Sequence, residues 1–175
     1  MRLSIQTLNM ENIKFITSWF EDSEVEKYVG GKEWILNALS RPALAKGKEF
    51  RGAKVLDRGG YVVFDNNKPV GYVEAEIYDK HTLLDDKSGV VKFSEDLVTA
   101  SFVYLVNPQL KGLGYGTEIL RNIISSMEFR EIKVFTASTD IGNIASEKSL
   151  TKAGFKMINQ SPNFEDVYIC EYKRD

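Results

Sequence analysis

One segment in the second half of the chain constrains the fold more than any other. Residues 99–106 form an apolar run rich in β-branched and aromatic residues, which is typical of a central strand. Glycines follow at alternate positions (Gly112, Gly114 and Gly116), and an amphipathic helix begins at once. The apolar face of that helix consists of Ile119, Leu120, Ile123, Ile124 and Met127. A buried strand that enters a helix in this way predicts a sheet covered by helices, an α/β layer architecture.

The remaining patterns predict the element order β-α-α-β-β-β-α-β-α-β. Strands are expected over 3–8, 61–64, 69–78, 99–106, 132–137 and 167–172, and helices over 10–20, 32–45, the segment after Gly116, and 143–153. Residues 79–96 are polar and predict a long surface loop, in which His81 is expected to be exposed. No repeat, low-complexity tract or linker interrupts the chain, so residues 1–175 are expected to form a single domain.

Charge and composition exclude several classes of function. Lys and Arg number 23 and Asp and Glu 25, so the net charge of −2 gives no support for a nucleic-acid partner. Cys170 and His81 are the only residues of their types, which excludes an internal disulfide and leaves too few ligands for a His/Cys zinc site. No apolar run is long enough to cross a membrane. We therefore expect a cytoplasmic protein with no metal.

The glycine-rich turn is suited to a phosphate group. Helix N-termini carry unpaired N–H groups and a partial positive charge, and glycines let a phosphate approach the backbone closely. Gly116-Thr117-Glu118 lacks the ending of a P-loop, and the glycine spacing and late position do not fit a dinucleotide-binding fingerprint. The alternative is that the glycines only form a tight turn.

Two segments together resemble the Gcn5-related N-acetyltransferase superfamily. One is Lys111-x-x-Gly114-x-Gly116, and the other begins at Asn143 and ends at Gly154-Phe155. The resemblance implies an acyl-CoA N-acyltransferase fold, α/β (α+β), with a mixed, mostly antiparallel central sheet flanked by helices. It also implies direct acetyl transfer from acetyl-CoA to a primary amine. The residues it assigns to coenzyme A are Leu105, Val106, Lys111, Gly112, Leu113, Gly114, Tyr115, Gly116, Thr117, Asn143, Ser146 and Ser149.

The chain departs from the family pattern at the position of a proton donor. Many members have a tyrosine seven residues after the asparagine, where this chain has Leu150. Tyr104, Tyr115 and Tyr168 are weaker substitutes, each of which can also be a core or rim aromatic, and Tyr104 is the catalytic candidate among them. For the base, Glu74 and Glu76 share one face of a strand, although both can equally point to solvent, and Glu95-Asp96 lies just before the central strand. The missing tyrosine keeps open a catalytically silent acyl-CoA-binding module.

The acceptor is not determined by the sequence. The acidic turn 21–24 and its flanks resemble the head of aminoglycoside 6′-N-acetyltransferases, but the branch that acetylates ribosomal protein N-termini has a similar turn, and a solvated turn explains it as well. The expected acceptor is therefore a small-molecule or peptide amine. We expect a monomer or a homodimer, and no membrane partner.

Overall fold

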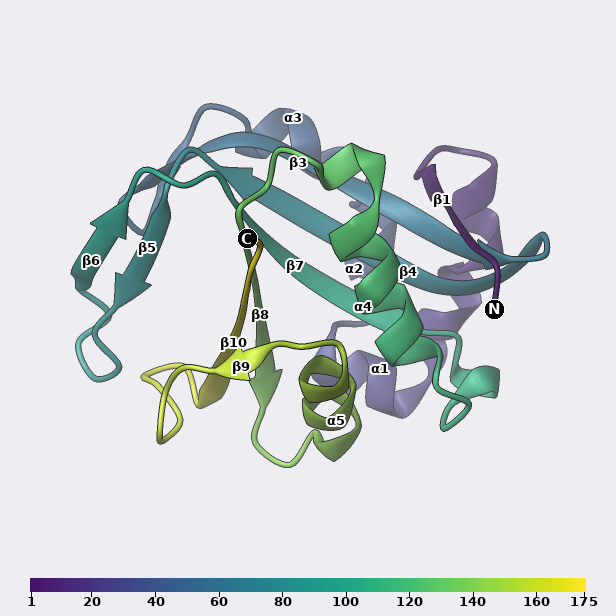
Figure 1. Cartoon of the computed structure of the whole chain (residues 1–175). Coiled ribbons are helices and arrows are strands. Elements are labelled where there is room, and N and C mark those ends of the chain that lie inside the picture. The colour runs from purple at the N-terminus through teal and green to yellow at the C-terminus, as the bar shows by residue number, and fades with distance from the viewer.

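A computed structural model describes all of residues 1–175. Its main sheet has eight strands, ordered β1-β3-β4-β7-β8-β10-β9, with β2 paired to β3. All pairs are antiparallel except β7 with β8, which confirms the expected mixed, mostly antiparallel sheet (Figure 1). The strands are β1 Leu3–Thr7, β2 Glu49–Phe50, β3 Ala53–Asp65, β4 Lys68–Tyr78, β7 Thr99–Val106, β8 Val134–Asp140, β9 Lys156–Met157 and β10 Val167–Lys173.

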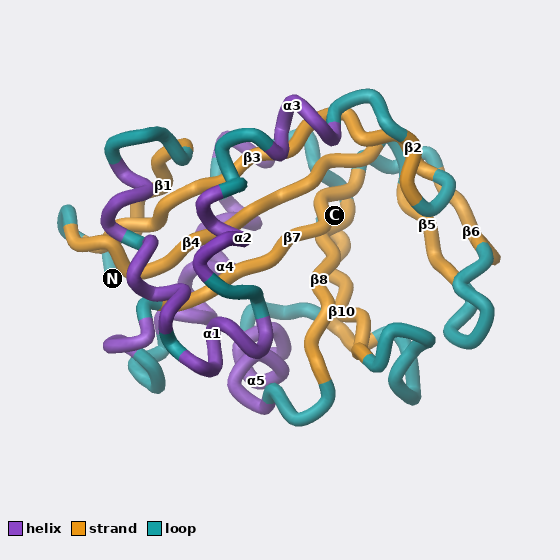
Figure 2. The backbone as a smooth tube through the Cα atoms, turned by 180° about the vertical axis from the view of Figure 1, so that it is seen from behind, coloured by secondary structure: helices purple, strands orange, loops and turns teal.

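Helices cover both faces of this sheet, and each face has its own core. The α-helices are α1 Ser23–Tyr28, α2 Lys32–Leu36, α3 Arg41–Ala45, α4 Tyr115–Ser125 and α5 Ile144–Lys152. Buried residues of α4 and α5, such as Ile119 and Leu150, belong to the larger core. The N-terminal segments supply the second core, where Phe20, Ile35 and Tyr72 pack together. Figure 1 shows the α4 side of the sheet and Figure 2 the side of the N-terminal helices.

The N-terminal half is more broken than its periodicity predicts. Residues 10–20 form two short 3₁₀ helices, Asn12–Phe15 and Thr17–Glu21, in place of one α-helix. The helix expected over 32–45 is divided into α2 and α3, with Pro42 in the first turn of α3, the position at which its missing N–H costs least. No helix of the chain is both long and apolar enough to cross a membrane.

The segment 79–96 is a β-hairpin and not an irregular loop. Strands β5 (His81–Leu84) and β6 (Val91–Glu95) pair with each other and project from one end of the molecule (Figure 1). The expectation that His81 is exposed is wrong, because its side chain is only 1% exposed. Its Nε2 lies 2.9 Å from Oε2 of Glu171 on β10, which anchors the hairpin to the main sheet. Periodicity within 79–96 does not reveal a carboxylate 90 residues away.

Candidate functional site

The parallel pair β7–β8 is short, and this creates a cleft. The two strands pair only where Thr99–Ser101 face Val134–Thr136, and beyond that point they separate. A cavity of about 530 Å³ lies between the end of β7, the glycine-rich turn, the start of α5 and α1. Eleven of the twelve residues predicted to bind a cofactor line it. The exception is Leu113, which lies outside the lining and whose side chain is 59% exposed.

The glycine-rich turn presents bare backbone to this cleft. Gly112 and Gly114 have φ angles of +78° and +85°, a region that favours glycine, and a Cβ on either would meet no atom within 4 Å. Gly114 is the N-cap of α4 and supplies no side chain to its first N–H groups. Gly116 is required for packing, since a Cβ there would lie 2.7 Å from Oγ of Ser149. The N–H groups at the start of α4 are therefore open to the cleft, an arrangement suited to an anion.

The free edge of β7 supplies a second set of donors. The N–H of Asn107 donates to the carbonyl of Val70, so the two-residue alternation of an antiparallel ladder turns the Leu105 N–H toward β4 as well. The N–H groups of Tyr104 and Val106 point the opposite way, toward the side where β8 has separated. Of Leu105 and Val106, the two residues of β7 that the resemblance assigns to coenzyme A, Val106 is thus the one whose N–H faces the cleft.

Helix α5 brings two polar groups to the opposite wall. The Asn143 side chain caps the helix by accepting a hydrogen bond from the Ser146 N–H at 3.2 Å, which leaves its amide NH₂ group free to donate. The Tyr104 hydroxyl lies 3.1 Å from Oγ of Ser146. Burial raises the pKa of Tyr104, so this hydroxyl keeps its proton at neutral pH.

The other candidate positions do not present a free phenol hydroxyl to α5. Leu150, at the position of the family tyrosine, is fully buried in the core. The Tyr115 hydroxyl donates to Asp65 at 2.9 Å, and Tyr168 does not line the cleft. Only Tyr104 brings a phenol hydroxyl to α5, next to Ser146 and one helical turn before Leu150.

The acidic turn at the start of α1 is bound to the glycine-rich turn. Nζ of Lys111 lies 3.1 Å from Asp22 and 2.7 Å from Glu24. The hydrogen bond from Lys111 contributes most to lowering the pKa of Asp22, whose carboxylate also caps α1. The turn that resembled an acceptor-binding head therefore lies beside the expected phosphate site.

Glu74 and Glu76 lie together on the face of β4 that carries the N-terminal helices. Arg41 and Arg58 approach the Glu74 carboxylate to 2.5 and 2.6 Å, and the Tyr72 hydroxyl donates to it at 2.9 Å. Burial alone would raise the pKa of Glu74, but the two arginines lower it below its usual value. Glu76 is paired with Arg58 at 2.7 Å. Neither carboxylate is simply a solvent-facing group, and Glu74 is a poor proton acceptor.

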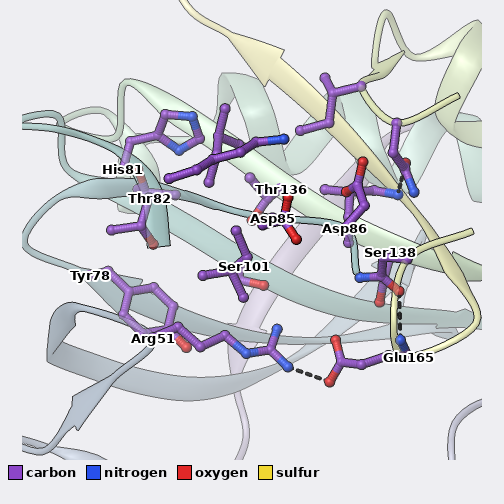
Figure 3. A pocket seen from close by; sticks show the side chains of 18 of the residues that line it. Arg51, Tyr78, His81, Thr82, Asp85, Asp86, Ser101, Thr136, Ser138 and Glu165 are labelled. Carbon is purple, nitrogen blue, oxygen red and sulfur yellow. Dashed lines mark hydrogen bonds and ion pairs between the residues drawn. The ribbon is translucent and has the colours of Figure 1, made fainter. Parts of the chain in front are cut away.

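A groove continues from these carboxylates beneath the β5–β6 hairpin. Its cavity of about 220 Å³ shares Tyr78 and Ser101 with the small pocket that contains Glu74 and Glu76. Figure 3 shows Ser101, Thr136 and Ser138 on its floor and the Arg51–Glu165 ion pair on its rim. Ser101 and Thr136 are the last paired residues of β7 and β8, so the groove reaches the point where the strands begin to separate, although it shares no lining residue with the cleft.

The sequence did not single out the arginines or the His81–Glu171 pair. Hairpin register offers a partial signal, since Arg58 is the cross-strand partner of Glu76. Arg41 comes from α3, whose position no local pattern predicts. Burial would raise the pKa of Glu171, while His81 and Lys173 lower it and keep this carboxylate charged.

Comparisons with known proteins agree with this geometry. A family model described as an acetyltransferase (GNAT) domain matches residues 2–156. A coenzyme A complex of the aminoglycoside acetyltransferase AAC(6')-Ib superposes with a TM-score of 0.71 at 14% identity, covering 99% of this chain and 95% of that one. An aminoglycoside N(6')-acetyltransferase from Legionella pneumophila gives 0.67 at 14%, covering 99% and 92%. The N-acetyltransferase PseH from Campylobacter jejuni gives 0.57 at 16%, covering 99% of each chain. No curated protein sequence matches.

Proposed function

Because this chain belongs to the GNAT acetyltransferase family, we propose that its cleft binds acetyl-CoA and that its groove binds the primary amine that receives the acetyl group. The protein is an acyltransferase of the N-acetyltransferase type. The observation that carries the assignment of the two sites is that the cleft lies where β7 and β8 have separated, while the groove reaches Ser101 and Thr136, the last paired residues of the same two strands. A cytoplasmic location, where acetyl-CoA is available, remains part of this proposal.

The cleft fits coenzyme A by the chemistry of its donors. The open backbone at Gly112 and Gly114 and the N-terminus of α4 would hold the pyrophosphate. The amide of Asn143 would hold the pantetheine arm, and the Val106 N–H would face the thioester carbonyl and stabilise the oxyanion formed there. When bound, the cofactor supplies an activated acetyl group.

The groove side would prepare the amine. Glu76 is 17% exposed and is the carboxylate we propose to accept a hydrogen bond from the amine as its proton passes to water. Glu74 is a positioning residue in this scheme, since it fixes Arg58, and Arg58 in turn fixes Glu76. On the opposite side Tyr104 would donate a proton to the departing thiolate.

The assignment is tested by free thiol release from acetyl-CoA. With a panel of primary amines, we expect amine-dependent release together with saturable binding of coenzyme A. A catalytically silent module would bind coenzyme A but release no thiol. Binding without release for every amine would therefore contradict the proposal.

Replacing Tyr104 with phenylalanine should lower kcat by about tenfold, less than the roughly 100-fold or more that a general acid usually contributes, because a thiolate also departs unaided. The affinity for coenzyme A should remain unchanged, since the ring still packs. Tyr168→Phe is the matched control, because Tyr168 lies outside the cleft. Equal kcat values for the two variants would remove Tyr104 from the mechanism.

A further inference from the structure

We propose that Tyr78 is a further catalytic residue, whose hydroxyl carries the proton of the acceptor amine from the groove to Glu76. The inference rests on the proposed function, and it refines the route by which the amine reaches that carboxylate. Its basis is that Glu76 does not line the groove, whereas Tyr78 lines the groove and is hydrogen-bonded to Glu76.

The two cavities on this face of the sheet have few lining residues in common. Glu74 and Glu76 are absent from the lining of the groove and belong to the small neighbouring pocket of about 150 Å³. Tyr78 and Ser101 are the residues that line both cavities (Figure 3). An amine bound in the groove can therefore contact Tyr78 or Ser101, but its link to either carboxylate has to pass through one of them.

Of these two residues, Tyr78 is the one that is bonded to a carboxylate. Its hydroxyl donates a hydrogen bond to Oε1 of Glu76, and the Arg58 guanidinium donates to Oε2 of the same carboxylate at 2.7 Å. Ser101 is the cross-strand partner of Glu76, but no hydrogen bond joins their side chains. The carboxylate is thus held with one oxygen toward the phenol, and the phenol oxygen can still accept a hydrogen bond.

The surroundings of Tyr78 keep its phenol in the protonated form. Burial, together with the hydrogen bond to Glu76, raises the pKa of Tyr78, although Arg58 and Arg51 oppose this shift. At neutral pH the hydroxyl can therefore donate to Glu76 while it accepts a hydrogen bond from an amine.

The proton transfer needs no further group. As the amine nitrogen bonds to the acetyl carbon it becomes positively charged, and one N–H bond breaks with its electron pair left on nitrogen. That proton passes to the phenol oxygen of Tyr78 while the phenol proton passes to Oε1 of Glu76. Glu76 then gives a proton to water, so both side chains return to their starting forms.

Replacing Tyr78 with phenylalanine should lower kcat for thiol release by about 100-fold, the lower end of the usual contribution of proton transfer by a side chain. The affinity for coenzyme A should remain unchanged, because Tyr78 lies outside the cleft, and this binding also reports that the variant is folded.

Tyr72→Phe is the matched control for this variant. Tyr72 lies on the same face of β4, and its hydroxyl also donates to a carboxylate, that of Glu74, but Tyr72 lines neither cavity. Loss of its hydroxyl should therefore affect stability and leave kcat nearly unchanged.

A double-variant cycle separates proton transfer from packing. If Tyr78 and Glu76 carry the same proton in sequence, removal of either group already breaks the path. Tyr78→Phe, Glu76→Gln and the double variant Tyr78→Phe/Glu76→Gln should then have similar kcat values, whereas independent roles would multiply the two losses.

The outcomes distinguish the two proposals. A native kcat for Tyr78→Phe, a loss no larger than that of Tyr72→Phe, or multiplied losses in the double variant would overturn the inference and leave the proposed function standing. If the native protein bound coenzyme A but released no thiol with any amine, both proposals would be overturned.

Discussion

Replacing Gly114 with glutamate is expected to weaken coenzyme A binding by more than about 100-fold. The new carboxylate would enter the open space in front of the α4 N-terminus, where the pyrophosphate is proposed to lie. Repulsion between unit charges a few ångströms apart is worth about 1 to 4 kcal/mol in a partly hydrated site. Isothermal titration with coenzyme A measures the loss directly.

The chain offers a matched control for this variant. Gly47 has a φ of +82°, close to the +85° of Gly114, and a Cβ there would also meet nothing within 4 Å. Glutamate at either position should therefore reduce stability by a similar amount, about 1 to 2 kcal/mol. Gly47 lies outside the cleft, so Gly47→Glu should bind coenzyme A as the native protein does. Equal affinities of the two variants would show that the glycine-rich turn does not hold the phosphates.

Glu74→Gln is expected to lower the free energy of unfolding by about 3 kcal/mol, the lower end for a broken buried ion pair. The substitution keeps the shape of the side chain but leaves Arg41 and Arg58 without their shared counter-charge. Glu21→Gln is the control, because Glu21 pairs with Lys32 at the exposed surface, where such a pair is worth less than about 1 kcal/mol. Urea denaturation compares the two, and losses of the same size would contradict the structural role of Glu74.

The same variant should change the response to acid. Burial opposes ionisation of Glu74, but the arginines outweigh it and depress the folded-state pKa. A carboxylate whose pKa is lower in the folded protein than in the unfolded chain stabilises the fold at pH values above the unfolded-state pKa of about 4.3. This stabilisation is lost as the pH falls through the folded-state pKa. The unfolding free energy of the native protein should thus decline between about pH 5 and pH 3 more steeply than that of Glu74→Gln. If the unfolding free energies of the two proteins declined in parallel, the ion pairs of Glu74 would not be the cause of the acid sensitivity.

Local sequence patterns predicted the parts of the site that are contiguous in the chain. The strand, the three glycines and the helix after them form a single unit. Gly112 and Gly114 have positive φ angles, a backbone conformation that glycine adopts more readily than any other residue. Asn143 and Gly154 likewise delimit α5 by capping chemistry, which acts within one helical turn. Leu113 was included with the turn by proximity in sequence, which does not tell which side chains face inward.

The parts that depend on distant contacts were not predictable. Continuous helices were expected over 10–20 and 32–45, but the structure breaks both. The apolar periodicity of a segment does not show where packing against the sheet interrupts a helix. The hairpin at 81–95 contacts the main sheet through His81, near the middle of the chain, and Glu171, near its C-terminal end. The charge state of the groove depends in the same way on which carboxylates meet arginines.

The sequence by itself therefore indicated the family and the cofactor class through the resemblance of two motifs, and it predicted the glycine-rich turn, because the backbone conformation there is fixed by a few neighbouring residues. Only the tertiary structure decided which tyrosine hydroxyl lies beside Ser146 of α5, whether Glu74 is a free base, and which charges around the groove are paired. Burial and ion pairing are properties of residues brought together from separate elements, and they set the pKa of each group and the charge that a substrate meets.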